Sequence, residues 1–397
     1  MAFLKPFALE RFFAKHEFSA RYLLCSSDCE SMPVRDLLAM DESATDRLLG
    51  LRLGYTETRG APSLREAIAT LYPGPGSGRP DVAGLADGGG QTAAGLSAAG
   101  VFVHAGAEEG ILNLCLAMLQ PGDKVVVNWP CYQSLAEIPS SLGCEVVPWY
   151  LREVPSSKGG LRWTLDPDEL PGLSGGKARL IVLNMPHNPT GALLTRQEFE
   201  AVVAYARSTG AVLLVDEVYR RLERDPARLL PSVCEAYENG VALDVLSKHS
   251  GLAGLRIGWL ASQRADLLDA VAQVKDYNSI CSSGPSEVLA ELAIRNMDRI
   301  VARNRDIVEH NLLLLDRFFA ERSDFATWTP PEGSSVAFPR LADGSDAEHL
   351  AERLVTEAGV LLLPGKYYQA DPARFRIGFG RANLPEALGK LAAWLNR

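Results

Sequence analysis

The chain of 397 residues carries a formal net charge of −9 at pH 7, so it lacks the basic surface with which proteins bind nucleic acids or anionic membranes. An apolar content of 47% and a charged content of 22% are ordinary for a soluble globular protein, and the length allows two or three domains. Residues 1–13 interrupt their apolar positions with charges and no stretch reaches bilayer length, which predicts a cytoplasmic protein without a signal peptide.

Several enzyme classes leave sequence signatures that this chain lacks. Its seven cysteines form no C-x-x-C pair and have no histidine at ligand spacing, which predicts reduced, mostly buried thiols and no metal site. The sequence contains no His-Glu-x-x-His and no phosphate loop ending in Gly-Lys-Ser/Thr, and its Gly-x-Ser-x-Gly match at 172–176 precedes an apolar run, whereas a nucleophile elbow follows a strand. Acyl transfer, metal-assisted hydrolysis and nucleotide cradling therefore find no support.

The N-terminal part is predicted to be an arm that precedes the main domain. Residues 1–50 contain a helical patch at Leu9–Phe18 and then a polar segment at Cys25–Ser31. Farther along, Ser63 is a candidate helix cap and Glu66 can complete a capping box.

The stretch 73–100 has an unusual composition. It holds nine glycines and three prolines but few large apolar side chains. This composition predicts a flexible surface insertion inside the large domain.

The middle of the chain alternates short apolar runs with helical segments. Thr195 and Glu198 predict a capping box for a helix that Gly210 ends. The apolar runs show no strict period of two, so both faces of their sheet are expected to be covered. The pattern predicts an α/β fold with a mostly parallel central sheet covered by helices, and its expected strands lie at Lys124–Trp129, Cys144–Trp149, Ala178–Asn184 and Ala211–Val215.

The C-terminal part is expected to build a smaller α+β domain together with the N-terminal arm. A helix is predicted at Ala265–Val274, and the run from Pro285 to Glu321 contains no further Pro or Gly, which suggests one long helix, either straight or kinked. Late strands are predicted at Val360–Leu363 and Arg374–Phe379. The expected division is therefore 1–50 for the arm, 51–284 for the large domain and 285–397 for the long helix with the small domain.

Four motifs between Asn184 and Trp259 concentrate the chemically reactive side chains. Each is weak alone, but together they place an amide, a carboxylate, a phenol, an amine and a guanidinium at the ends of consecutive apolar runs. An open α/β sheet builds its site at this edge. The motifs are Asn184-Met-Pro-His-Asn-Pro-Thr-Gly191, Leu214-Val-Asp-Glu-Val-Tyr219, Ser247-Lys248 and Gly254-Leu-Arg-Ile-Gly-Trp259.

These five groups match the needs of pyridoxal 5′-phosphate. Lys248 can hold the aldehyde as a Schiff base, and Asp216 can keep the pyridine nitrogen protonated. Asn188 and Tyr219 can donate hydrogen bonds to the phenolic oxygen, and Arg256 can bind the phosphate through its fixed guanidinium.

In the order and spacing of these residues, the chain resembles the class I/II aminotransferases, which are fold type I pyridoxal phosphate enzymes. The resemblance covers nearly the whole chain and implies a homodimer in which Tyr55 reaches the neighbouring subunit's phosphate. It also implies a second phosphate anchor at the helix start formed by Gly106, Ala107 and Glu108, and an aromatic ring, Tyr132, stacked on the pyridine.

The same resemblance assigns the substrate α-carboxylate to Arg376, which would grip it with two parallel hydrogen bonds. Strand alternation puts Arg374 on the same face, so periodicity alone does not separate the two arginines.

Two features depart from the family pattern. Val245 stands where relatives often carry a phosphate-binding hydroxyl, although Ser247 keeps a hydroxyl beside the lysine. The N-terminal segment is acidic where many relatives have a short apolar one, so Asp28 or Glu30 could pair with a cationic substrate side chain.

The resemblance implies an aminotransferase, in which the freed Lys248 amine removes the α-proton of an amino acid and a 2-oxo acid is formed. The alternative on the same fold is elimination, cyclisation or decarboxylation, as in the capreomycidine synthase-like members that act on arginine derivatives. A third class, the ligand-sensing domain of some transcription regulators, would need a basic DNA-binding domain before Tyr55, for which the acidic chain leaves no room.

Overall fold

The computed structural model describes residues 4–74, 77, 95–157 and 159–397. The predicted flexible insertion at 73–100 thus falls mostly outside the described residues. Within the described part, no helix has both the length and the apolar character needed to cross a membrane.

A seven-stranded sheet forms the centre of the large layer, with the strand order β1-β9-β8-β7-β6-β2-β3. Every neighbouring pair from β8 to β3 is parallel, and β9 alone runs antiparallel to its neighbours β8 and β1. The prediction of a mostly parallel sheet is confirmed. The strands are β1 (Val101–His104), β2 (Lys124–Trp129), β3 (Glu145–Tyr150), β6 (Ala178–Asn184), β7 (Val212–Asp216), β8 (Gly240–Val245) and β9 (Gly258–Ser262).

Helices cover both faces of this sheet, which explains the continuous apolar runs of its inner strands. Leu214 of β7 packs in the apolar cluster of one face, while its neighbour Leu213 packs in the cluster of the other. Helices α5 (Ala107–Met118), α6 (Gln133–Ser141) and α10 (Ala265–Lys275) contribute to the first cluster. The second cluster includes residues of α4 (Pro62–Ala69), α7 (Leu170–Ser174), α8 (Arg196–Thr209), α9 (Val233–Ala236) and α11 (Gly284–Arg295).

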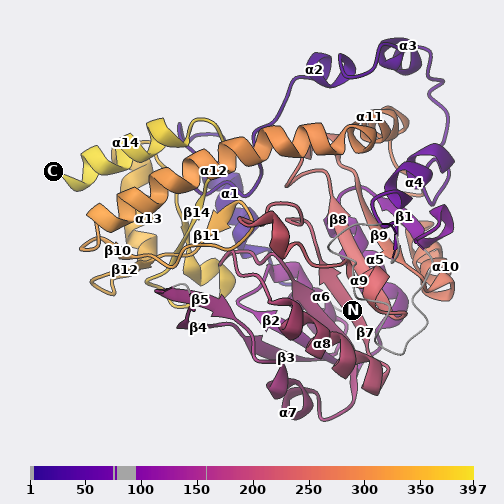
Figure 1. The fold of residues 1–397 in the computed structure, drawn as a ribbon, viewed down its shortest axis with the longest axis horizontal. Helices are drawn as coiled ribbons and strands as arrows, with labels where there is room; N and C mark the ends of the chain where they lie inside the picture. The colour runs from indigo at the N-terminus through magenta and orange to yellow at the C-terminus, as the bar shows by residue number, and fades with distance from the viewer. Residues whose placement is uncertain (1–3, 75–76, 78–94, 158) are drawn as a thin grey trace.

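The C-terminal segments build a second layer around the three-stranded sheet β11-β14-β13. Figure 1 shows α12 (Met297–Glu321) running along this layer, and α14 (Leu384–Leu395) contacts both α12 and α13 (Ala347–Glu357). Its strands are β11 (Val336–Ala337), β13 (Leu363–Pro364) and β14 (Phe375–Gly378), and β10 (Ala326–Thr327) pairs separately with β12 (Arg340–Leu341). The late strands occur where predicted but are shorter.

The N-terminal arm joins this C-terminal layer. Tyr22 forms a parallel bridge with Val360, and the Gly378 amide donates to the Leu24 carbonyl at 2.8 Å. A Cβ at Gly378 would collide with the Ser26 carbonyl, so the close passage of the arm over β14 requires glycine there. Helix α1 (Ala8–His16) packs beside the turn η6 (Gly365–Tyr368).

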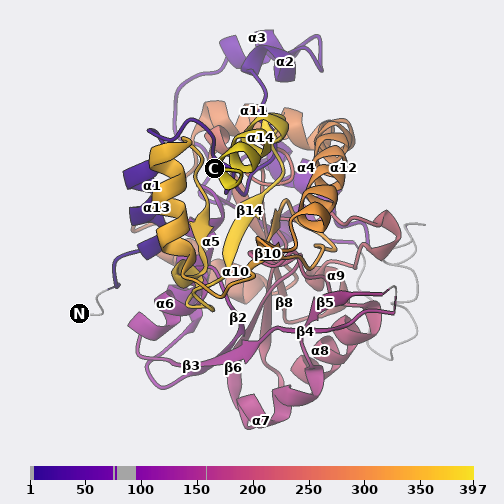
Figure 2. The same ribbon diagram turned by 90° about the vertical axis from the view of Figure 1, so that its left-hand side faces the viewer.

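Two short helices that follow the N-terminal arm project from the body of the molecule. Figures 1 and 2 show α2 (Val34–Leu38) and α3 (Ala44–Leu49) standing away from the sheet in both views. Tyr55 follows them and is 91% exposed in the single chain, as are the large side chains Leu49 and Leu53 for most of their surface. This end of the molecule therefore presents an apolar surface.

Two local predictions need comment. The run from Pro285 to Glu321, expected as one long helix that could be kinked, is helical on both sides of Asn296, and this residue separates α11 from α12. The helix α4 begins at Pro62 with Ala61 as its cap, and Ser63 instead donates to Glu291 at 2.7 Å, so no capping box forms.

The capping box predicted at Thr195 and Glu198 is present, and Gly210 ends that helix in a left-handed conformation. The remaining elements are the hairpin β4 (Arg152–Pro155) and β5 (Leu161–Thr164), and the short 3₁₀ turns η2 (Ala98–Gly100), η3 (Pro167–Glu169), η4 (Pro226–Arg228) and η5 (Ala253–Leu255).

Candidate active site

A cavity of about 420 Å³ opens at the carboxyl edge of the central sheet. β7 ends at Asp216, β8 ends three residues before Lys248, and β9 begins just after Arg256 at this same edge. The floor comes from these strand ends, while α1, the segment 26–28 and Arg376 of β14 form the opposite wall. Its volume suits a small molecule.

Lys248 lies partly buried in the cavity wall. Its Nζ donates a hydrogen bond to Ser27 Oγ at 2.9 Å. Burial lowers the pKa of the Lys248 amine, although the nearby Asp28 carboxylate opposes the shift. A lowered pKa increases the fraction of unprotonated amine, which is the form that attacks an aldehyde.

Asp216 lies at the last position of β7, opposite Leu243 of β8. The side chain is 6% exposed, and burial raises the pKa of its carboxyl to about 7. The Val218 amide donates to Oδ1 at 3.3 Å, and no salt bridge within the described residues includes Asp216. A buried carboxyl that lacks a cation and faces a cavity fits the ring nitrogen of pyridoxal phosphate.

Tyr219 and Asn188 lie on the same wall. The Tyr219 hydroxyl is buried with the side chain only 1% exposed, and it has no hydrogen-bond partner among the described residues. Asn188 Oδ1 accepts from the Tyr368 hydroxyl at 2.9 Å and from Arg376 Nη1 at 3.3 Å. An unpartnered buried hydroxyl aimed into a cavity indicates a missing polar ligand.

The start of α5 and Arg256 form an anion site at one end of the cavity. Gly106 caps α5 with a positive φ of 85°, and a Cβ added there would collide with the Arg256 guanidinium. The unpaired amides after Gly106 and this guanidinium therefore face the same place, which suits a phosphate. Ala107, Glu108 and Ser247 also line the cavity.

Two side chains at the anion site need comment. Glu108 is a carboxylic acid beside the expected phosphate. Burial raises the pKa of its carboxyl to about 7, which reduces its repulsion of an anion, and Ser134 Oγ donates a hydrogen bond to it at 3.1 Å. Val245 also lines the cavity, so the hydroxyl that many relatives offer at this position is replaced by an apolar contact.

Arg376 is a buried cation without a carboxylate partner. Its side chain is 2% exposed and donates only to neutral oxygens, the Cys25 carbonyl at 2.7 Å and the Tyr368 hydroxyl at 2.5 Å among them. No salt bridge within the described residues involves it. Burial of an uncompensated guanidinium is costly, so its site suits an anionic ligand.

The neighbouring arginines are both engaged elsewhere. Arg374 forms a salt bridge with Glu153 at 2.7 Å and lies over the Trp163 ring, outside the cavity. Arg381 binds both oxygens of Asp28, at 3.0 and 2.9 Å. The structure therefore separates Arg376 from Arg374, which the strand periodicity alone could not do.

The same contacts revise the prediction for Asp28 and Glu30. Asp28 does line the cavity, but Arg381 already neutralises its carboxylate. Glu30 instead accepts from the Ala382 amide at 2.8 Å, on the side of the C-terminal segment. Neither carboxylate is available to a cationic substrate in this arrangement.

Three cavity residues, Ser27, Glu10 and Glu17, escaped the sequence interpretation, although all lie in segments that it described. Ser27 holds Lys248. Tyr368 does not line the cavity and lies outside those segments, but it joins Asn188 to Arg376. Glu10 and Glu17 line the cavity from α1 and its end, and Tyr132 donates from its hydroxyl to Glu10 at 3.2 Å. The sequence pattern predicted the helix α1, but it did not indicate that this helix lines the cavity.

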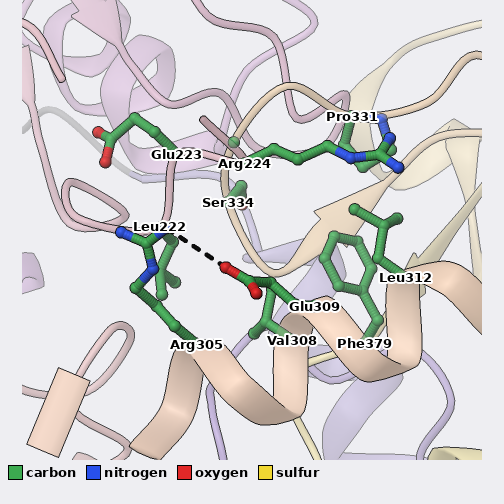
Figure 3. Close-up of a pocket in the computed structure, with 11 residues that line it drawn as sticks. Leu222, Glu223, Arg224, Arg305, Val308, Glu309, Leu312, Pro331, Ser334 and Phe379 are labelled. Atoms are coloured by element: carbon green, nitrogen blue, oxygen red, sulfur yellow. Dashed lines mark hydrogen bonds and ion pairs between the residues drawn. The ribbon is translucent and has the colours of Figure 1, made fainter. Parts of the chain in front are cut away.

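A second hollow lies away from this site, between α12 and the segment that follows β7 (Figure 3). Figure 3 shows Arg305 and Glu309 of α12 paired with one another at its rim, an ion pair of 3.3 Å. Its volume of about 10 Å³ has room for about one water molecule, so it is not a substrate site.

The comparisons agree with this geometry. The family described as "Aminotransferase class I and II" matches residues 23–391. The chain is 30% identical to capreomycidine synthase of Streptomyces vinaceus, over 96% of this chain and 93% of that protein. It is 26% identical to the arginine–pyruvate transaminase of Pseudomonas aeruginosa, over 88% of this chain and 84% of that one.

Two solved structures share the whole fold. A PLP-dependent aminotransferase from Streptococcus suis superposes with a TM-score of 0.86 at 30% identity, covering 99% of this chain and 98% of that chain. The PLP-dependent cyclase OrfR also gives a TM-score of 0.86, at 27% identity, covering 99% and 97%. With a cavity whose unpartnered groups fit pyridoxal phosphate, the chain belongs to the class I and II aminotransferase family of pyridoxal phosphate-dependent enzymes.

Proposed function

We propose that the protein is an aminotransferase that acts on an amino acid through Lys248. The observation that carries the proposal is the shared cavity in which an amine of lowered pKa, a buried unpaired carboxyl and a buried unpaired guanidinium meet. Pyridoxal phosphate supplies an aldehyde for the amine and an electron-poor ring that stabilises a carbanion.

Each protein group then has one task. Asp216 holds the proton of the ring nitrogen, and Asn188 and Tyr219 donate to the phenolic oxygen. Within one subunit, the phosphate would be bound by Arg256, Ser247 and the amides of Gly106, Ala107 and Glu108.

Substrate binding and proton transfer fall to two further groups. Arg376 binds the α-carboxylate and so fixes the α-carbon relative to Lys248. Burial lowers the pKa of the Lys248 amine, which favours its role as the general base that takes the α-proton. Tyr132, at the start of α6, would stack on the ring.

The second candidate function is elimination or cyclisation of an amino acid on the same scaffold. It is favoured by the similarity to capreomycidine synthase and to the cyclase OrfR. The similarity to an arginine–pyruvate transaminase instead supports transamination, with arginine or a related amino acid as the substrate.

One experiment separates these candidates. The purified holoenzyme is mixed with single amino acids without a 2-oxo acid, and the cofactor spectrum and the products are followed. An aminotransferase converts the cofactor to its pyridoxamine form and releases one equivalent of 2-oxo acid. A cyclase or eliminase restores the original spectrum and releases a product of a different mass, which would contradict the first proposal.

Replacing Arg376 by glutamine is expected to raise the KM for amino acids about 10- to 100-fold, because two charge-assisted hydrogen bonds to the α-carboxylate are lost. The matched control is Arg374→Gln, which breaks the ion pair with Glu153 outside the cavity. Steady-state kinetics of both variants check the assignment. Equal increases in KM for the two variants would contradict it.

We also propose a homodimer in which the exposed Tyr55 reaches the phosphate of the neighbouring subunit. The exposed apolar side chains around α3 support this, because a single chain gains nothing by exposing them. We further propose that the chain divides into an arm at 1–50, a large domain at 51–284 and a small domain at 285–397. We also propose a cytoplasmic location.

A further inference from the structure

Part of the cavity wall is formed by helix α1, which brings two carboxylates to it. Glu10 and Phe13 of α1 line the cavity, and so does Glu17, which caps the helix. Positions three and four residues apart lie on one face of a helix, so these three side chains form a single row. The row faces the same space as Lys248 and Arg376.

The carboxylates of this row take part in no ion pair within the described residues, whereas the arginines of the cavity each have an anionic partner or an expected one. Arg381 pairs with Asp28, and under the proposed function Arg256 pairs with the phosphate and Arg376 with the α-carboxylate. Asp216 takes the ring nitrogen. No salt bridge within the described residues includes Glu10 or Glu17, although Glu17 lies near enough to Arg381 and Lys248 for their charges to act on it.

Both carboxylates lie close to the reacting groups. Glu10 accepts the Tyr132 hydroxyl at 3.2 Å, and Tyr132 is the ring expected to cover the cofactor. Burial raises the pKa of the Glu17 carboxyl; Arg381 opposes the rise, while the charges of Glu10 and Asp28 add to it. The two carboxylates therefore repel one another until a cation lies between them.

A second group in the same cavity indicates what ligand this is. Arg376 is a buried cation without a carboxylate, with its side chain 2% exposed. The ligand must therefore bring an anionic group to Arg376, while its other end lies against an acidic wall. Arg381 cannot attract a distal carboxylate instead, because Asp28 already holds it.

We propose that Glu10 and Glu17 bind the cationic end of the substrate side chain, a guanidinium or an ammonium group, and so select basic amino acids. The inference rests on the proposed function, since it takes the substrate to be an amino acid held by Arg376. It assigns the choice of side chain to α1 and not to Asp28.

The test compares arginine and lysine with citrulline, which has nearly the shape of arginine but no charge. For wild type, Glu10→Gln, Glu17→Gln and the double variant, two quantities are measured: kcat/KM, and the amino-acid concentration that half-saturates the change in cofactor absorbance. Glu200→Gln, the same substitution on the exposed face of α8, is the matched control.

Each single substitution is expected to lower kcat/KM for the cationic amino acids about 10- to 100-fold and to weaken their binding equally, with citrulline unchanged. The control is expected to match wild type. An equal loss for citrulline, or no loss for either cationic amino acid, would overturn the inference. Failure of the proposed function has a different signature: no amino acid would then change the cofactor spectrum of the wild-type protein.

Discussion

Lys248→Ala is expected to lower turnover by about 10³-fold or more and to abolish the visible absorbance of cofactor bound as a Schiff base. The variant removes both the covalent attachment of the cofactor and the base that takes the α-proton. The amine donates only to Ser27 among the described residues, so little folding free energy depends on it. Absorbance spectra and single-turnover rates of purified protein provide the measurement.

Lys248→Arg serves as the matched variant for this prediction. It keeps a cation beside Asp28 but cannot form an imine, so it should be as inactive as the alanine variant. Melting temperatures close to wild type for both variants would show that the loss is chemical. A Lys248→Ala protein that keeps the visible absorbance without substrate would contradict the assignment.

Asp216→Asn is expected to lower kcat about 10²- to 10³-fold, a loss of roughly 3 to 4 kcal/mol of transition-state stabilisation. An amide cannot carry the negative charge that keeps the ring nitrogen protonated, so the ring becomes a weaker electron sink. Rapid-mixing kinetics with a reactive amino acid measure the effect. Unchanged kcat in this variant would mean that another group contacts the ring nitrogen.

The same carboxyl predicts a pH dependence of the cofactor-free protein. Burial raises the pKa of Asp216 to about 7, above its value in the unfolded chain of about 4, so the folded protein binds the extra proton between these limits. Its contribution to stability is therefore complete below about pH 4 and is lost as the pH rises to about 7. Urea unfolding of Asp216→Asn should show a pH slope smaller by up to about 1.4 kcal/mol per unit in this window.

Much of the large layer could be predicted from local patterns. Apolar runs that alternate with capped helices, such as the one opened by Thr195, indicate a parallel sheet whose strand ends share an edge. Asn188 and Lys248 follow such strand ends, Asp216 is the last residue of one and Arg256 precedes another strand; the structure brings all four to one cavity.

The missed features depend on contacts between distant parts of the chain. Arg374 and Arg376 differ only because Glu153, more than two hundred residues away, pairs with the first. Asp28 appears free in the sequence, but Arg381 at the far end of the chain neutralises it. The pattern of α1 shows a helix, yet the orientation of Glu10 toward the cavity follows from packing against η6. The break at Asn296 has no Pro or Gly to signal it.

The central claim is that one particular lysine carries the cofactor. Among the lysines that the structure describes, burial lowers the pKa of two: Lys248 in the cavity and Lys275, which instead donates to the Val103 carbonyl at 2.7 Å. Reducing the holoenzyme with borohydride and mapping its peptides by mass spectrometry tests the claim directly. The account predicts the pyridoxyl phosphate mass on Lys248; the same mass on Lys275 or on any other lysine would contradict it.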